Sequence, residues 1–340
     1  VEQDDNFEPY TVNPDLLVLE GLPRTDLDAE VETTSVDIRA NYRPRWQPLR
    51  KLRLRGAYHY DDRDYDRSRD AYQYVRGDGA DQPPAIASIF ANRYDNQREG
   101  FSLAGDYRLS FWRSKLSAEY DYEQVERRNA SVGETETDTY RLVLRAKPLQ
   151  QLSSRLSWSY ADRKADDYQF DESFFTRRTT EFINQTPDDQ RFDNHPALSQ
   201  YHLANSETDE VKFDLGYSGI EQWYFAADVT WRDINYDQSV FGLIEAQSWY
   251  YGLDVQYSPE DDVSVFGYLN FTRYEPDSAG RSFAGGAEKV ATDTVPPLAQ
   301  GSDPSRDWSV DVRDDVITVG LGLNWDYSDR LKLETQFVYV

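Results

Sequence analysis

The chain has 340 residues and a formal net charge of −25, because 62 Asp and Glu residues outnumber 37 Lys and Arg residues. It contains no Cys, which excludes a disulfide framework, a thiolate metal site, a catalytic Cys and covalent haem attachment. So negative a chain lacks the basic footprint of a nucleic-acid-binding protein, and no apolar run approaches the roughly 18 residues of a transmembrane helix.

The chain begins at Val1 and contains no Met, so we expect a processed or truncated chain. Residues 1–30 are expected to form an N-terminal segment. From residue 31 onward, apolar and polar residues alternate, which is the pattern of strands with one apolar face. In the stretch 223–232, for example, Trp223, Phe225 and Val229 alternate with Asp228 and Thr230.

The alternation predicts six hairpins, which span residues 31–60, 100–122, 138–160, 208–232, 248–274 and 316–340. The turns inside the hairpins are short, and most carry Pro, Gly, Asp or Ser: 43–48, 112–114, 147–151, 218–222, 258–262 and 326–330. Three long polar connections, 61–99, 161–207 and 275–315, and two shorter ones, 123–137 and 233–247, are expected between the hairpins.

Short turns at one end and long loops at the other are typical of a transmembrane β-barrel. Aromatic residues at the strand ends match the belt found at membrane–water boundaries: Tyr58, Tyr60, Tyr120, Tyr122, Trp158, Tyr160, Trp231, Phe271 and Tyr274. A large soluble β-sandwich or propeller is the alternative, but a sandwich would bury its apolar face against a second sheet.

We therefore predict an all-β fold, an antiparallel transmembrane β-barrel over residues 31–340, in which twelve strands can be recognised, two in each hairpin.

Several sequence stretches resemble the outer-membrane barrels of the MtrB/PioB type, which associate with decahaem cytochromes. They are residues 22–34 (LPRTDLDAEVETT), 52–64 (LRLRGAYHYDDRD), 135–145 (TETDTYRLVLR), 308–311 (WSVD) and 316–325. The order and spacing of these stretches carry the resemblance from about residue 20 onward. The chain departs from the family in having no Cys pair near its N-terminus and fewer strands than most members. The resemblance therefore implies that the twelve strands are part of a larger barrel in the bacterial outer membrane, with a divergent small relative as the alternative.

The resemblance implies a barrel that surrounds a periplasmic multihaem c-type cytochrome and supports electron transfer across the outer membrane. The partner would supply the haem, this chain would bind none covalently, and it would perform no catalysis. An extracellular cytochrome is left open as a further partner. Membrane lipid is expected outside the barrel, and no nucleic acid is expected. The alternative function is a general diffusion porin, with 161–207 as its constriction loop, including Phe174, Phe175, Arg177 and Arg178.

Alternation places charged side chains of both signs on the face that would line the lumen and meet the partner. The residues expected there are Arg53, Arg55, His59, Arg108, Arg141, Arg145, Arg155, Asp214, Asp228, Arg232, Asp254 and Glu334. The first three hairpins contribute mostly Arg, whereas the later ones contribute more carboxylates. A lumen divided in this way would orient a partner of complementary charge.

Candidate metal ligands are few. His195 and His202 lie in the same predicted loop near Asp193, which permits a metal site but is better read as a pair of solvated loop histidines. Acidic groups in 61–66 and at Asp162, Asp166 and Asp167 leave calcium binding open, without an EF-hand spacing.

Gly320 and Gly322 both fall on the polar face. Small residues there would let an object in the lumen approach the wall closely, although ordinary relief of crowding between strands is the simpler interpretation.

Overall fold

The computed structural model describes residues 2–3, 29–47, 49–67, 69–76, 85–90, 93–186, 188, 191–192, 195–236, 238–260, 262–282, 303–328 and 330–340. The fold is all-β, as predicted. One antiparallel sheet of 14 strands contains every strand except β4 (Ala71–Arg76) and β5 (Ala85–Phe90), which pair with each other. Residues 4–28, and with them most of the expected N-terminal segment, lie outside the described residues.

Twelve long strands form the body of the sheet, in agreement with the six predicted hairpins. They are β2 (Ala29–Tyr42), β3 (Leu52–Arg67), β6 (Asn96–Arg108), β7 (Lys115–Arg127), β8 (Glu134–Leu149), β9 (Leu152–Ala165), β10 (Ser206–Tyr217), β11 (Trp223–Asn235), β12 (Gly242–Glu260), β13 (Val263–Arg281), β15 (Asp314–Ser328) and β16 (Leu331–Tyr339). The short strands β1 (Glu2–Gln3) and β14 (Asp307–Asp311) pair with β2 and β13.

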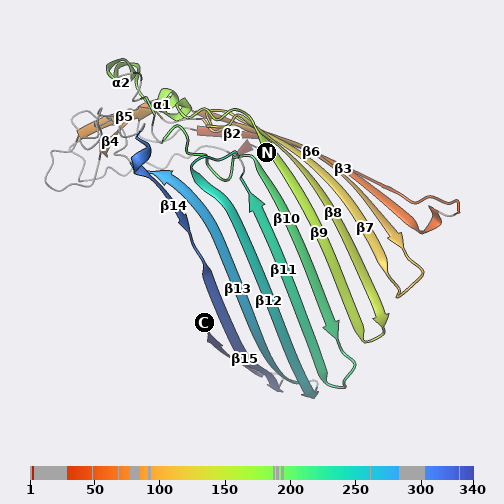
Figure 1. The fold of residues 1–340 in the computed structure, drawn as a ribbon. Helices are drawn as coiled ribbons and strands as arrows, with labels where there is room; N and C mark the ends of the chain where they lie inside the picture. Colours follow the sequence, from red (N-terminus) through yellow and green to blue (C-terminus); the bar gives the residue numbers. More distant parts are fainter. Residues whose placement is uncertain are drawn as a thin grey trace.

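The three long connections all lie at one end of the strands, opposite the six hairpin turns (Figure 1). One end carries the six short turns, the first of which includes a 3-10 turn, η1 (Leu49–Lys51). The other end carries the long connections, with α1 (Glu172–Arg177), α2 (Thr180–Gln185), the β4–β5 hairpin, η4 (Pro304–Arg306) and β14. We call these the turn end and the loop end.

Several strands are longer than expected, and two predicted connections are accordingly wrong in extent. β7 continues to Arg127 and β8 starts at Glu134, so only 128–133 remain of the predicted connection 123–137. In the same way, β11 continues to Asn235 and β12 starts at Gly242, so only 236–241 remain of the predicted connection 233–247. The acidic stretch 61–66 belongs to β3 rather than to a loop. These extensions carry polar residues on both faces, so alternation of hydropathy does not reveal them.

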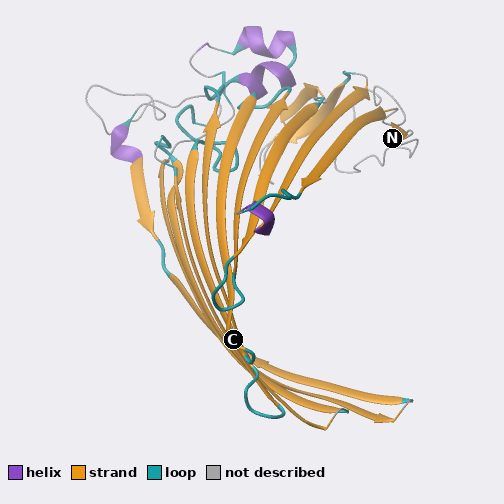
Figure 2. Ribbon diagram, turned by 90° about the vertical axis from the view of Figure 1, so that its right-hand side faces the viewer, coloured by secondary structure: helices purple, strands orange, loops and turns teal. Residues whose placement is uncertain are grey.

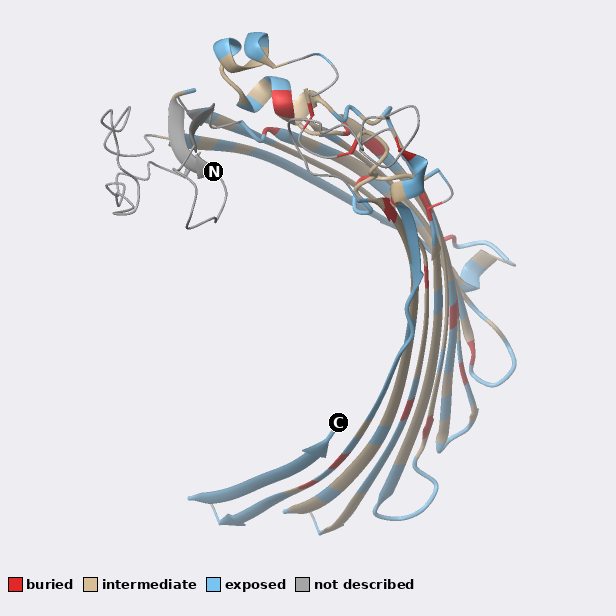
Figure 3. Ribbon diagram, turned by 60° about the vertical axis from the view of Figure 1, so that its left-hand side comes forward, coloured by how far each residue is buried: buried red, intermediate tan, exposed pale blue. Residues whose placement is uncertain are grey.

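The sheet is strongly curved and open, and β16 is not paired with β1 or β2 (Figures 2 and 3). Side chains converge on the inner side of a curved sheet and spread apart on its outer side. Leu103, Leu253 and Leu321 on the apolar face are 58%, 53% and 60% exposed, whereas Val143 and Ser157 on the polar face are 6% and 7% exposed. The polar face is therefore the concave one, and the apolar face is convex.

Two belts of aromatic side chains cross the convex face. The belt nearer the loop end consists of Tyr58, Phe101, Tyr120, Tyr122, Tyr140, Trp158, Tyr160, Trp231, Trp249, Tyr251 and Phe271. The belt nearer the turn end consists of Tyr217, Trp223, Phe225, Tyr257 and Trp325. On β11, Trp223 and Trp231 are eight residues apart, about 26 Å along a strand. At the usual tilt of barrel strands this is a height of about 20 Å, which fits within the apolar band of about 25 Å of outer-membrane barrels.

Beyond the loop-end belt, the convex face becomes acidic on nearly every strand. The residues there are Asp62, Glu99, Glu126, Glu136, Asp138, Asp162, Asp209, Asp233, Glu245, Glu275 and Asp277. Belt aromatics hydrogen-bond to this acidic band: Tyr120 donates to Asp138 at 2.6 Å, and Trp158 donates to Asp209 at 3.2 Å. Side chains with an apolar ring and a hydrogen-bonding tip suit a boundary between hydrocarbon and water.

Among the described residues, no helix has the length and apolar character needed to cross a membrane.

Candidate partner interface on the concave face

All twelve residues that the sequence assigns to the lumen lie on one face of the sheet. Four of them are directly opposed across neighbouring strands: Arg145 of β8 is opposite Arg155 of β9, Arg155 is opposite Asp214 of β10, and Asp214 is opposite Asp228 of β11. The same alternation places Arg53, Arg55 and His59 on this face of β3, opposite Asp106, Ala104 and Gly100 of β6. This face is the concave one described above.

The turn end of this face, from β2 to β11, holds two cavities rich in cationic side chains. The first, of about 460 Å³, is lined by six of them: Arg43, Arg50, Lys51, Arg53, Arg108 and Lys115. The second, of about 490 Å³, is lined by five, Arg113, Lys115, Arg145, Lys147 and Arg155, and on its β10–β11 side by Asp214 and Asp228. Lys115 lines both, so the ten cations form one continuous surface, which we call the basic zone.

Three carboxylates line the two cavities beside the ten cations. Asp214 and Asp228 line the second cavity, and Asp106 is the one acidic residue that lines the first. It accepts a hydrogen bond from Lys115 at 3.1 Å and lies 3.7 Å from a guanidinium nitrogen of Arg55. Within the part of the chain that the structure describes, Arg108, Arg145 and Arg155 form no ion pair. These cations are available to a molecule outside the chain.

The sign of the charge changes between β9 and β10. Arg155 on β9 is directly opposite Asp214 on β10, which in turn is opposite Asp228 on β11, and Asp254 follows on β12. One oxygen of the Asp214 carboxylate, Oδ2, is enclosed and has no hydrogen-bond partner among the described residues. At its turn end, the concave face therefore changes from mostly cationic side chains on β2–β9 to carboxylates on β10–β12.

The remaining predicted residues are distributed along the same face. Arg141 lies 3.7 Å from Glu119, Arg232 is opposite Glu210, and Glu334 is opposite Asn324. Sequence reasoning missed six of the ten cations of the basic zone, namely Arg43, Arg50, Lys51, Arg113, Lys115 and Lys147. These residues lie in or beside turns, where alternation carries no information on facing. A count of the cations beside the short turns could have found them.

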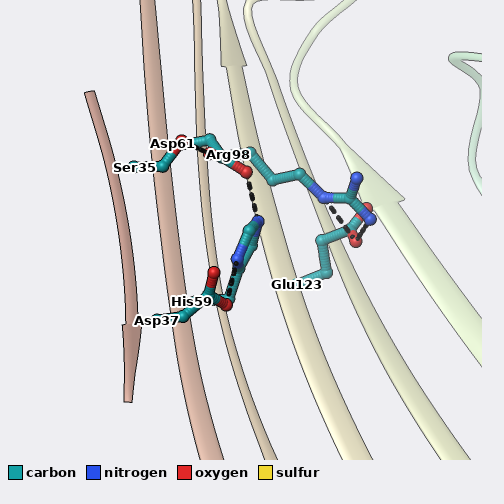
Figure 4. Close-up of polar contacts among 6 residues, drawn as sticks. All are labelled: Ser35, Asp37, His59, Asp61, Arg98 and Glu123. Atoms are coloured by element: carbon teal, nitrogen blue, oxygen red, sulfur yellow. Dashed lines mark hydrogen bonds and ion pairs between the residues drawn. The ribbon is translucent and has the colours of Figure 1, made fainter. Parts of the chain in front are cut away.

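His59 lies in a polar cluster nearer the loop end (Figure 4). Its Nδ1 is 3.1 Å from Asp37, and its Nε2 contacts the carboxylate of Asp61, which also accepts a hydrogen bond from Ser35. Next to it, the Nε of Arg98 donates to Glu123 at 2.8 Å. His59 is thus a hydrogen-bonded residue of the concave wall, held by carboxylates on two strands.

The spaces over Gly320 and Gly322 are filled by the chain itself. A Cβ atom on Gly320 would overlap the ring of Tyr268, and one on Gly322 would overlap the ring of Phe266. Both rings come from directly opposed positions on β13. The idea that these glycines admit an object in the lumen is therefore wrong: their small size accommodates two cross-strand aromatic rings.

The two loop histidines do not act together. His195 is buried, accepts a hydrogen bond from the Ala197 N–H at 3.0 Å and packs against Phe241, so the interpretation as a solvated residue is wrong for it. His202 instead packs against Tyr201, and Asp193 lies outside the described residues.

In the parts that the structure describes, no three His, Asp or Glu residues are grouped to hold a metal ion. In β3 the acidic side chains of 61–66 alternate between the two faces, so they do not converge.

The predicted constriction loop forms a small helical unit at the loop end (Figure 1). Phe174 is buried within it against Phe175 and Phe182, and the Arg178 guanidinium lies over two of these rings. Arg69 from the neighbouring long connection donates to the Thr176 carbonyl at 2.7 Å. The two loops thus pack on each other beyond the strand ends.

Comparison with known proteins gives one curated relative and several barrels of known structure. Outer membrane protein MtrB of Shewanella baltica (strain OS185) is 23% identical over 320 residues, which are 94% of this chain and 40% of the relative. The chain thus spans less than half the length of this protein.

Among solved structures, the ferric-catecholate import receptor Fiu of E. coli K12 has a TM-score of 0.49 at 9% identity, covering 93% of this chain and 50% of the receptor. The ferric enterobactin receptor PfeA of Pseudomonas aeruginosa has a TM-score of 0.46 at 11% identity, covering 92% and 52%. None of these descriptions is that of an enzyme.

The model of the MtrB/PioB family, described as outer membrane β-barrel porins, matches residues 1–340. The match covers the whole sequence, and the sheet has the two aromatic belts and the sorted loops of a membrane barrel. The chain is an outer-membrane β-barrel protein and belongs to the MtrB/PioB family.

Proposed function

We propose that this chain forms part of the wall of a sheath that houses a multihaem c-type cytochrome and so supports electron transfer across the outer membrane. The observation that carries the proposal is the concave face, which bears charges of both signs and on which Arg108, Arg145 and Arg155 have no ion-pair partner among the described residues. Such a face is costly to leave unpaired and suits contact with a charged protein surface.

The convex face supports the same proposal. Its apolar band and aromatic belts place lipid on the outside, so a protein on the concave side would be separated from hydrocarbon by the full thickness of the sheet. A chain of haems within a protein needs such insulation, because its charged surface could not enter lipid. The barrel would contribute shape and charge, and the partner would contribute all of the redox chemistry.

The test is purification of the full-length protein in mild detergent from cells that make all neighbouring gene products. We expect a haem protein to co-purify, with c-type absorbance that is lost when the cytochrome gene is deleted. An empty, ion-conducting barrel without haem absorbance would overturn the proposal.

A diffusion porin is the second candidate function, favoured by the description of the family and by the mixed charges of the concave face. A porin would conduct ions in planar bilayers in the presence of all its natural neighbours. A sheath filled by a cytochrome would conduct only after the cytochrome has been removed. Measuring conductance on the same preparation before and after removal therefore separates the two functions.

A further inference from the structure

The basic zone is unusual for this chain. Ten cationic side chains line two joined cavities at the turn end of β2–β9, in a protein whose net charge is −25. Bringing like charges together on a concave surface raises their mutual repulsion, because the low-dielectric wall focuses the field. Asp106, Asp214 and Asp228 line the same cavities, so ten cations minus three carboxylates leaves an excess of seven positive charges.

We infer that the basic zone is a docking surface for an acidic protein surface inside the barrel, which it holds in one orientation. The inference rests on the proposed function in one respect, that a protein occupies the concave side. It adds which part of the wall binds that protein, the charge of the surface that is bound, and the direction in which the surface faces.

The extent of the zone favours a macromolecule over a small anion. The zone reaches across six adjacent strands, from β2 to β9, which is about 25 Å at the usual spacing between strands. One phosphate or carboxylate would contact two or three of the cations and leave the others unpaired. An acidic protein surface can pair with all of them at once.

The position of the zone favours a protein over lipid. The two cavities open on the concave face, whereas the aromatic belts that mark the lipid boundary lie on the convex face. Lipid head groups therefore have no direct access to the zone. A protein in the lumen does.

The charge boundary between β9 and β10 supplies the orientation. A partner that turned its acidic surface toward β10–β12 would bring carboxylates against Asp214, Asp228 and Asp254. Like charges juxtaposed at an interface strongly disfavour that arrangement. Only a rotation that places the acidic surface over the basic zone satisfies both sides of the boundary.

The inference can be tested with a haem-free probe. The full-length barrel is prepared from cells without the neighbouring gene products, in mild detergent, and titrated with a fluorescent 20-residue poly-glutamate peptide. Binding is expected at low salt, despite the net negative charge of the chain, and it should weaken as salt is added. The double variant Arg145→Gln with Arg155→Gln is expected to bind at least tenfold more weakly.

The matched control is Arg39→Gln with Lys212→Gln, where Lys212 is the cation of β10 opposite Thr230; it removes the same charge from the same face outside both cavities. It should change the affinity less than twofold. A second test variant, Arg113→Gln with Lys147→Gln, alters cations at or beside the turns and serves if the first variant fails to fold. Folding of each is checked by heat-dependent gel mobility.

Equal binding of the peptide by the wild type and the folded zone variants would overturn the inference. So would displacement of the peptide by inorganic phosphate at an equal concentration of charge, since that would indicate a small-anion site. The probe carries no haem and the barrel carries no cytochrome. Failure here is therefore distinguishable from failure of the co-purification test, which would overturn the proposed function.

Discussion

At the scale of single residues, the environment of each side chain is set by whether it lies on the convex or the concave face of the sheet. Leu321 and Thr318 lie three positions apart on β15, but they point to opposite faces. Leu321 belongs to the convex face, between the two aromatic belts, and Thr318 belongs to the concave face. The same residue type introduced at the two positions would thus enter lipid in one case and the lumen in the other.

We therefore expect Leu321→Arg to destabilise the folded barrel by about 2–4 kcal/mol, as a guanidinium does near the midplane of a membrane barrel. The matched variant Thr318→Arg should cost much less, because its side chain meets water or the partner. The measurement is reversible unfolding of the full-length protein in lipid vesicles. Similar losses of stability in both variants would contradict the assignment of faces.

A second residue-scale prediction concerns Asp307, at the start of β14 outside the long strands. The Arg281 guanidinium donates to both of its carboxylate oxygens, at 2.5 and 3.1 Å, and holds the pKa of Asp307 below its usual value. The direction of the pH dependence follows from linkage between proton binding and folding. At pH values above the ordinary pKa of an Asp carboxyl, the ion pair stabilises β14. This stabilisation is lost as the pH falls through the lowered pKa of Asp307.

Asp307→Asn should therefore speed amide hydrogen exchange in the peptide covering 307–311 at neutral pH. The difference from the wild type should shrink as the pH falls below the range in which the wild-type carboxyl titrates. Equal exchange in the two proteins at neutral pH would show that the pair does not hold β14. The β10 strand, far from the substitution, serves as the internal reference.

At the scale of elements, the hairpins share one plan: a short turn at one end and a longer or more structured connection at the other. In bacterial barrels the short turns face the periplasm and the long loops face the exterior. The β9–β10 connection, with α1 and α2, and the β10–β11 turn lie at opposite ends of the same strand. They form a matched pair for testing the orientation of the barrel.

An epitope inserted after Tyr201, an exposed residue of the β9–β10 loop, should be labelled by antibody on intact cells. The same epitope inserted after Ile220, in the β10–β11 turn, should be labelled only after the outer membrane is permeabilised. Labelling of the Ile220 insertion alone on intact cells would reverse the orientation. Surface exposure of both insertions would rule out a single membrane crossing by β10.

Much of this arrangement can be predicted from sequence because a period of two fixes which side chains share a face. Leu103, Leu142, Phe225 and Leu321 all lie on the convex face, as their alternation indicates. The strand ends could not be predicted, because 123–127 and 134–137 lie beyond the belt, where both faces meet water. The rings over Gly320 and Gly322 depend on cross-strand register, which no single stretch of sequence contains.

At the scale of the whole molecule, the charge is separated in space rather than spread evenly. The excess of carboxylates includes a band around the convex face above the loop-end belt, whereas ten of the 37 cations gather at the turn end of the concave face. The net value of −25 therefore describes neither surface. The turn end of β2–β9 on the concave face therefore carries a positive field, and the convex face above the loop-end belt carries a negative one.

The length of β13 has a consequence for the environment in which the sheet is stable. Ten residues follow Phe271, the last belt residue on this strand, and they extend to Arg281, which is about 33 Å along the strand. The convex face of this part carries Arg273, Glu275 and Asp277, and Arg273 pairs with Asp315 at 2.7 Å. The two parts of β13 are therefore in different environments. The stability of the part on the turn-end side of Phe271 depends on the thickness of the lipid bilayer. The part from residue 272 to Arg281 is surrounded by water, and its stability responds to salt and pH.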